Sequence, residues 1–119
     1  MQFNIKIKIV FYGMDYSKHE SWYLLIGTNP YYLPSLNIQN DNKKIEEDIA
    51  RLCDKYSINS ELLNIEFHNC VKEQSNFSLY YKAMLPYEYR VQNINRIYYK
   101  EFMSNNVLIP EKNIILRGL

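Results

Sequence analysis

The residues best suited to chemistry in this sequence are grouped in one short charged stretch. Its charged members are Glu46, Glu47, Asp48, Arg51, Asp54 and Lys55. Carboxylates are ligands that Mg²⁺ and Mn²⁺ prefer, whereas a guanidinium group can bind a phosphate through two parallel hydrogen bonds. Glu47, Arg51 and Asp54 are spaced at i, i+4 and i+7, so they share one face if the stretch is helical. We expect Glu46 and Asp48 to point elsewhere.

Tyrosines form a second group of interest. The chain has twelve, and three pairs are adjacent in sequence, at positions 31–32, 80–81 and 98–99. Neighbouring side chains on a strand point to opposite faces, so one member of each pair faces the core and the other faces outward. An exposed tyrosine can stack on a base or anchor a protein partner. The alternative is that the tyrosines only fill core and surface positions.

The segment 86–91 (PYEYRV) predicts an exposed surface that is both aromatic and basic, with Arg90 and nearby Arg96. Such a surface can bind a protein, a nucleotide or single-stranded nucleic acid. The formal net charge of +1 gives no electrostatic reason to expect nucleic acid or an acidic membrane as the partner. The sequence therefore neither predicts nor excludes nucleic acid as a binding partner.

Histidine and cysteine do not predict a metal site. His68 and Cys70 alternate on a predicted strand, but no second His–Cys pair completes a tetrahedral zinc site. We expect a packed or edge histidine and a buried free cysteine instead. With two cysteines, Cys53 and Cys70, a disulfide framework is not expected, and the chain is predicted to be cytoplasmic. Three glycines are too few for a glycine-rich phosphate loop.

Length and composition predict one globular domain over residues 1–119. Apolar residues make up 47% and charged residues 23% of the chain, as in ordinary globular proteins. No apolar run approaches the roughly 20 residues that cross a bilayer, so no membrane association is expected. The first ten residues alternate lysine with isoleucine, which is the pattern of a strand and not of a signal peptide.

Hydrophobic spacing predicts a mixed α/β (α+β) fold. Strands are expected at residues 3–12, 22–27 and 31–33, then a hairpin of residues 62–71 and 77–85, and a last edge strand at 114–116. A central amphipathic helix is predicted at about residues 42–56, with Asp41 or Asn42 as its N-cap. A C-terminal helix is predicted at about residues 93–104. This order favours helices packed on a mixed sheet.

Residues 33–58 (LPSLNIQNDNKKIEEDIARLCDKYSI) resemble the Nudix box, G-x5-E-x7-R-E-U-x-E-E-x-G-U, where U is aliphatic and Leu-Pro-Gly often precedes. Placing Ile58 on the last aliphatic position fixes the others without a gap. The conserved motif positions then carry Leu36 and Ser57 (the two glycines), Asn42 (the upstream Glu), Ala50 and Arg51 (Arg-Glu), Leu52 (the aliphatic residue), and Asp54 and Lys55 (Glu-Glu). The flanking strands and the closing helix also resemble a Nudix domain.

The resemblance implies a pocket for a nucleotide-type ligand, with Trp22, Tyr31 and Tyr32 near it. In the family, the motif carboxylates hold Mg²⁺ ions that bridge a diphosphate and activate a water. Here only Asp54 remains an acid at those positions, whereas Arg51 and Lys55 carry positive charge. The sequence therefore predicts a degenerate Nudix-like domain that needs no cofactor.

Several readings of the motif remain open. Arg51 can stand in for the lost cation and bind phosphate, assisted by Lys55 and Arg90, or it can simply pair with Glu47 and Asp54 on a solvated helix. The predicted function is binding of a nucleotide-type small molecule or a protein partner. One alternative is an active Mg- or Mn-dependent nucleoside-diphosphate-X hydrolase that uses Glu47 and Asp54 as displaced ligands. Another is a structural or homodimerising module.

Overall fold

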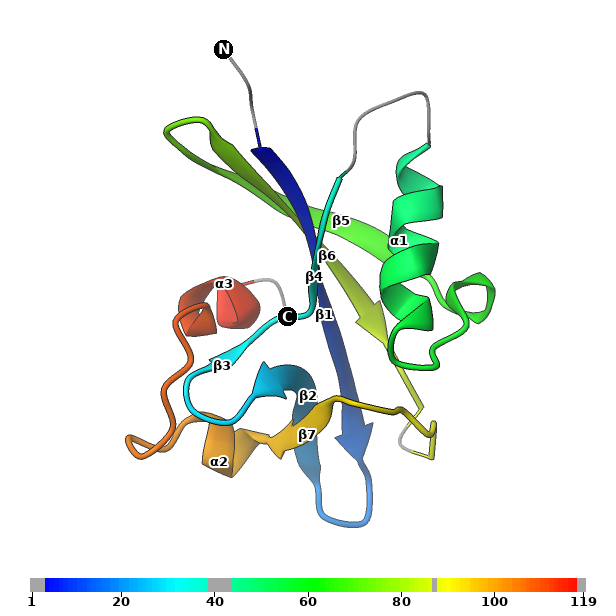
Figure 1. The fold of residues 1–119 in the computed structure, drawn as a ribbon. Coiled ribbons are helices and arrows are strands. Elements are labelled where there is room, and N and C mark those ends of the chain that lie inside the picture. Colours follow the sequence, from blue (N-terminus) through cyan, green and yellow to red (C-terminus); the bar gives the residue numbers. More distant parts are fainter. Residues whose placement is uncertain (1–3, 39–43, 87, 118–119) are drawn as a thin grey trace.

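A mixed β-sheet runs through the computed structural model, which describes residues 4–38, 44–86 and 88–117 (Figure 1). The elements in chain order are β1 (Asn4–Asp15), β2 (Glu20–Gly27), β3 (Tyr31–Tyr32), β4 (Ser35–Asn37), α1 (Ile45–Asp54), the 3₁₀ helix η1 (Ser60–Leu62), β5 (Ile65–Glu73), β6 (Asn76–Met84), β7 (Asn95–Tyr98), α2 (Tyr99–Phe102) and α3 (Lys112–Arg117). In the described part of the chain, no helix is long and apolar enough to cross a membrane.

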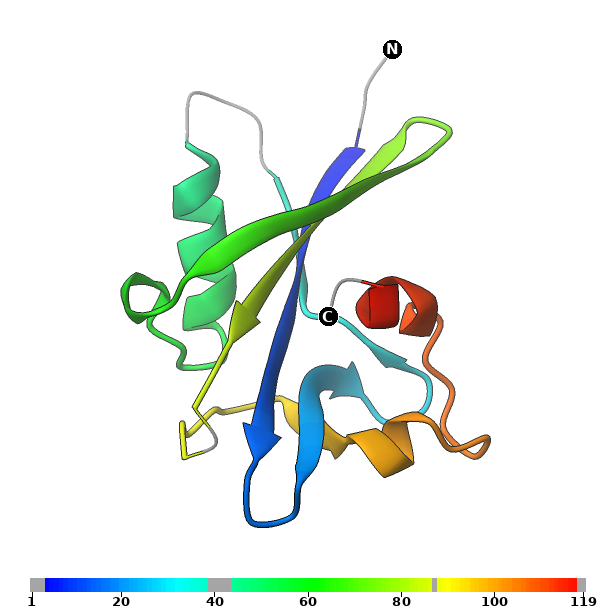
Figure 2. The same cartoon turned by 180° about the vertical axis from the view of Figure 1, so that it is seen from behind.

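β1 is the centre of the sheet. One edge of β1 pairs in parallel with β6, from Asn4 opposite Asn76 to Tyr12 opposite Met84. Its other edge is shared, because β4 pairs with the first half of β1 and β2 with the second half, both antiparallel. The main strand order is β3-β2-β1-β6-β5, and β7 pairs with β2. The β5–β6 hairpin and the β1–β2 hairpin therefore reach opposite ends of the molecule (Figure 2).

The alternation of β1 divides the core between the two faces of the sheet. Ile7, Ile9 and Phe11 are fully buried on the face that α1 covers, where Leu52 of the helix joins them. Val10 faces the other way, into the cluster formed with the region of α2 and α3. Figure 1 shows α1 and α3 on opposite sides of β1. The alternating apolar pattern thus fixes which helix lies on which face.

The central helix and the hairpin are confirmed, with α1 at Ile45–Asp54 and β5 and β6 at Ile65–Glu73 and Asn76–Met84. Lys44 is the N-cap residue of α1 and makes no side-chain capping bond. The N-cap predicted at Asp41 or Asn42 lies outside the described residues.

Two predictions near the C-terminal end are wrong. Of the helix predicted at residues 93–104, only Tyr99–Phe102 is helical, because Asn95–Tyr98 pairs with β2 as β7. Its apolar spacing suits a helix, but the edge of β2 offers a ladder of backbone hydrogen bonds, and tertiary pairing overrides local propensity. The strand predicted at residues 114–116 lies inside α3. A short apolar run does not distinguish a strand from a buried helix.

Candidate functional site

The end of α1 fixes how the motif lies on the helix. Ser57 has a φ of 61°, in the left-handed region that favours glycine. The N–H of Ile58 donates to the carbonyl of Cys53 at 3.1 Å, and the N–H of Ser57 donates to that of Asp54 at 3.2 Å. These two bonds form the Schellman motif that often closes a helix. Ser57 is the residue that the motif places on its second glycine, so the backbone supports this register.

The charged face of α1 includes Asp48, which we expected to point away from Arg51. Asp48 is 1% exposed, and its Oδ1 accepts a short hydrogen bond from the guanidinium of Arg51. Glu47, Asp54 and Lys55 are exposed. The partner of Arg51 is therefore Asp48, at i−3, and not Glu47 or Asp54. The other carboxylate oxygen of Asp48 and Nε of Arg51 are buried without a hydrogen-bond partner among the described residues.

These residues do not fit a divalent cation held in the manner that the resemblance implies. Arg51 and Lys55 stand where ligand carboxylates would be needed, and Asp48 is already paired with a guanidinium. A cation this close to Mg²⁺ costs several kcal/mol even at an effective dielectric of about 20. Among residues 4–38, 44–86 and 88–117, no three His, Cys, Asp or Glu side chains gather closely enough to hold a metal ion.

The aromatic residues predicted to line a nucleotide pocket do not gather beside α1. Trp22 is fully buried in the core on the α1 face, and the guanidinium of Arg96 lies 4.2 Å from its ring centroid. Its ring therefore has no open face for a base. Tyr31 is half-buried against the core on the opposite face of the sheet, and its neighbour Tyr32 is 44% exposed. This pair follows the predicted division into one inward and one outward ring.

Arg90 is exposed beside a shallow hollow of about 410 Å³. Glu88, Tyr89, Val91 and Arg96 also line this hollow, as expected for an aromatic and basic surface. The guanidinium of Arg96 donates to the carbonyl of Tyr89 at 3.1 Å, so it helps to hold the segment in place. No α1 residue lines this hollow, so Arg90 and Arg51 do not share a pocket.

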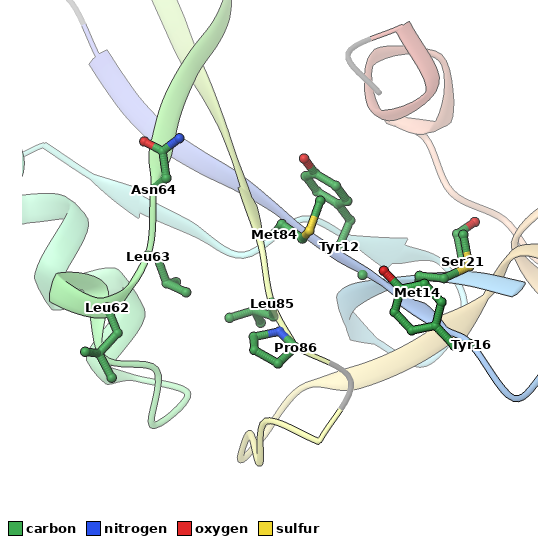
Figure 3. A pocket seen from close by; sticks show the side chains of 11 residues that line it. Tyr12, Met14, Tyr16, Ser21, Leu62, Leu63, Asn64, Met84, Leu85 and Pro86 are labelled. Atoms are coloured by element: carbon green, nitrogen blue, oxygen red, sulfur yellow. The ribbon is translucent and has the colours of Figure 1, made fainter.

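A cavity of about 530 Å³ lies where the carboxyl ends of the parallel strands β1 and β6 approach η1 (Figure 3). It is lined by residues 12–14, 16, 21, 62–64 and 84–86. Leu62 and Met84 are 73% and 62% exposed, so its rim presents uncovered apolar surface. Of these residues only Pro86 belongs to a predicted binding surface, the segment 86–91. Apolar residues at strand ends are the signal for this cavity, but a sequence pattern does not separate them from core residues.

Gly13 sets the inner wall of this cavity. A β-carbon at this position would lie 2.3 Å from the Trp22 ring and 2.6 Å from the carbonyl oxygen of Leu85. Both distances are far below van der Waals contact, so the wall requires glycine. The missing side chain lets the Trp22 ring pack directly against β1.

A buried polar cluster on the other face surrounds Glu111. Its carboxylate accepts hydrogen bonds from Lys8 at 2.7 Å, from the Tyr80 hydroxyl at 3.1 Å and from the Leu33 N–H at 3.0 Å. Burial, reinforced by the charge of Glu111, raises the pKa of the Tyr80 hydroxyl. No sequence pattern pointed to this cluster, since its members are far apart in the chain. It connects α3 to the central strands.

The cysteines and His68 form no reactive site. Cys53 is buried. Burial is the larger cause that raises the pKa of its thiol to about 11, and the nearby charge of Asp54 is the second. Cys70 is exposed, so the expectation that it is buried is wrong. A β-bulge at His68 interrupts the β5–β6 register between Phe67 and Asn69 and shifts the residues that follow. Nε2 of His68 lies 3.2 Å from the carbonyl oxygen of Ile114, so this is the packed edge histidine that we expected.

No protein-family model matches the sequence, and no curated protein matches it either. Solved structures match in three dimensions. A MutT/nudix family protein from Enterococcus faecalis is 16% identical with a TM-score of 0.69, over 82% of this chain and 44% of that chain. This chain thus spans less than half the length of that protein.

Two further structures match over nearly the whole chain. The NUDIX domain of Shewanella oneidensis NrtR, solved with ADP ribose, is 14% identical with a TM-score of 0.71, over 99% of this chain and 86% of that one. The C-terminal domain of mouse MUTYH, solved with human PCNA, is 10% identical with a TM-score of 0.72, over 98% and 87%. At such low identities the likeness shows the fold alone. The Nudix-like fold expected from residues 33–58 is confirmed.

Proposed function

We propose that this protein uses its Nudix fold to bind a nucleotide-type ligand without hydrolysing it and without a metal cofactor. The observation that carries the proposal is the Asp48–Arg51 ion pair on the motif helix. It places a guanidinium where a hydrolase of this type would need a carboxylate. On this proposal the protein has the fold of an enzyme family but acts only by binding its ligand.

The chemistry of diphosphate cleavage explains why this ion pair matters. Hydrolysis needs a cation to neutralise the bridging phosphates and to lower the pKa of the attacking water. An arginine can neutralise phosphate charge, but it does not acidify a bound water as a metal does. Because Arg51 is paired with Asp48 at this position, α1 is not suited to this catalysis.

The fold and the apolar cavity support a small-molecule ligand. The NrtR domain that shares this fold was solved with ADP ribose, which is a nucleotide-type molecule. The cavity of about 530 Å³ at the ends of β1 and β6 is within the usual size of small-molecule sites. Its lining is mainly apolar and includes hydroxyl and amide groups, as in most such sites.

A protein partner is the second candidate. The MUTYH domain with this fold was solved in complex with PCNA, and the rim residues Leu62 and Met84 expose apolar surface of the kind that protein partners cover. This candidate predicts no response to nucleotides. A mass that rises with concentration in light scattering would assign the partner to a second copy of the chain.

A thermal-shift panel with a parallel turnover assay tests the proposal. The ligands are AMP, ATP, ADP-ribose and NAD, each with and without Mn²⁺. We expect a rise in melting temperature for at least one nucleotide, unchanged by Mn²⁺, and no cleavage products. Metal-dependent cleavage that Glu47→Gln or Asp54→Asn removes would establish the hydrolase alternative instead. No shift with any nucleotide would reject nucleotide binding.

A further inference from the structure

We propose that the ligand is a nucleoside monophosphate that binds at the β1–β2 hairpin end of the molecule. Its base enters the apolar cavity, and its phosphate lies against Lys18, His19 and Lys100. This inference rests on the proposed function and names the site that performs it. No residue of α1 lines the site, so it differs from the one that the motif predicts.

A second hollow lies beside the apolar cavity. This hollow measures about 330 Å³ and is lined by residues 14, 18–21, 99 and 100. Met14 and Ser21 line both spaces, so the two adjoin each other at these side chains. The first space is enclosed mainly by apolar side chains, whereas the second is formed by the hairpin turn and α2. One ligand can therefore occupy both with two chemically different ends.

The charges at the two spaces differ. Of the described residues, no Lys, Arg, Asp or Glu lines the apolar cavity, whereas Lys18 and Lys100 line the second hollow. The ammonium of Lys18 lies 4.3 Å from the centroid of the Tyr98 ring, a cation–π contact that holds it in place. Glu20 also lines the hollow, and its Oε2 accepts the backbone N–H of Lys100 at 2.9 Å. Two lysines and one carboxylate leave the hollow with one net positive charge, which complements a phosphate.

The charges on the opposite side of the apolar cavity also favour a nucleotide whose phosphate points toward Lys18. There Leu63 and Asn64 separate it from a groove of about 520 Å³ along α1. Among the described residues, the charged ones that line this groove are acidic: Glu46, Glu47 and Glu61. An anionic group is repelled from that side and attracted to the hairpin side. The phosphate of a bound nucleotide must then point toward Lys18.

The polar groups inside the apolar cavity favour a nucleobase over a purely hydrocarbon ligand. Tyr12 and Tyr16 provide rings for stacking, and Ser21 and Asn64 add a hydroxyl and an amide (Figure 3). Nδ2 of Asn64 donates to Glu66 at 3.0 Å, which orients the amide. A hydrocarbon ligand would bury these groups without hydrogen bonds, at a free-energy cost.

Calorimetric titration of AMP and of adenosine tests the assignment. We expect wild-type protein to bind AMP about tenfold more tightly than adenosine, because charge-assisted hydrogen bonds hold the phosphate. In the variant Lys18→Gln/Lys100→Gln this difference should disappear while adenosine binding persists. Lys72→Gln, an exposed lysine on the distant β5–β6 strand pair, is the matched control and should keep the difference. Tyr16→Ala should weaken both ligands.

Other outcomes overturn the assignment in distinguishable ways. If the double variant binds AMP normally and Arg51→Ala does not, the nucleotide lies on α1, and only this inference fails. If phosphotyrosine binds and AMP does not, the ligand class is wrong. If neither AMP nor adenosine binds while ADP-ribose does, the monophosphate assignment fails and the proposed function stands. If no nucleotide binds, both proposals fail.

Discussion

Ser57 shows at the scale of one residue how closely this chain keeps the backbone of the motif. Its left-handed conformation places its β-carbon against its own backbone, which glycine would avoid. The hydrogen bonds that close α1 hold it there. The side chain differs from the glycine of the motif, whereas the backbone conformation is the one that glycine favours.

Ser57→Gly should therefore stabilise the protein. We expect the free energy of unfolding to rise by about 0.5–1 kcal/mol, since relief of the left-handed strain exceeds the extra chain entropy of glycine. Urea denaturation measures the change. Ser57→Ala is the control and should give no gain, because alanine keeps the β-carbon. A loss of stability in Ser57→Gly would contradict the assigned helix end.

Asp15 makes stability depend on pH. Its carboxylate accepts hydrogen bonds from the Ser17 hydroxyl at 2.7 Å and the Tyr98 hydroxyl at 3.2 Å, and from two backbone N–H groups of the turn. The bond from the Ser17 hydroxyl is the largest cause that lowers the pKa of Asp15, and burial opposes it in part. A lowered pKa adds stability above the unfolded value of about 3.9, which is lost as the pH falls through the folded value.

Asp15→Asn should lower the melting temperature at pH 7 and have a smaller effect at pH 3. Below the unfolded value the carboxyl takes up its proton first in the unfolded chain, so the stabilisation that its charge provides declines and the difference between the two proteins shrinks. Calorimetry at both pH values gives the comparison. An equal difference at the two pH values would show that the charge of Asp15 contributes nothing.

At the scale of elements, α1 joins a buried carboxylate to a partly exposed arginine. Arg51→Ala removes the cation from Asp48 and should cost about 1–2 kcal/mol, less than for a fully buried pair because Arg51 is 40% exposed. The variant Arg51→Ala/Asp48→Ala should lose less than the sum of the single changes, and urea unfolding of all four proteins measures this coupling. Additive losses would mean that the pair does not interact.

Periodic elements could be predicted from the sequence because their pattern is local. The stripe of Ile45, Ile49, Leu52 and Tyr56 identified α1, and two strand-like runs joined by a polar turn identified the β5–β6 hairpin. β7 could not be found this way, since Asn95–Tyr98 becomes a strand only beside the edge of β2. Whether such a segment forms a strand depends on a pairing strand about 70 residues away, and local spacing carries no information about that strand.

The candidate site was harder to predict than the fold. The charged group on α1 could be identified from its spacing, but the burial of Asp48 depends on tertiary packing that the pattern does not contain. Trp22 is a core residue and not an open pocket residue as predicted, because aromatic rings suit a core as well as a pocket. Lys18 and Lys100 are brought together by the pairing of β7 with β2 and the turn into α2.

At the scale of the whole molecule, Glu111 connects parts of the chain that are distant in sequence. Glu111→Gln keeps the shape of the side chain but leaves Lys8 beside a neutral group. Both residues are largely buried, so we expect a loss of about 1–3 kcal/mol in urea denaturation. Glu101→Gln on the exposed surface is the control and should change stability by at most about 0.5 kcal/mol. Equal stabilities of the two variants would exclude a role for the buried charge.

The parallel pairing of β1 with β6 also bears on synthesis at the ribosome. Its first hydrogen-bonded residues, Asn4 and Asn76, are 72 positions apart, so β1 emerges long before its central neighbour exists. During that interval only the other edge of β1 can pair, with β2 and β4, so the backbone groups on the edge that faces β6 stay unpaired. A nascent chain halted before β6 should therefore attract chaperones, and release should follow once β6 has emerged.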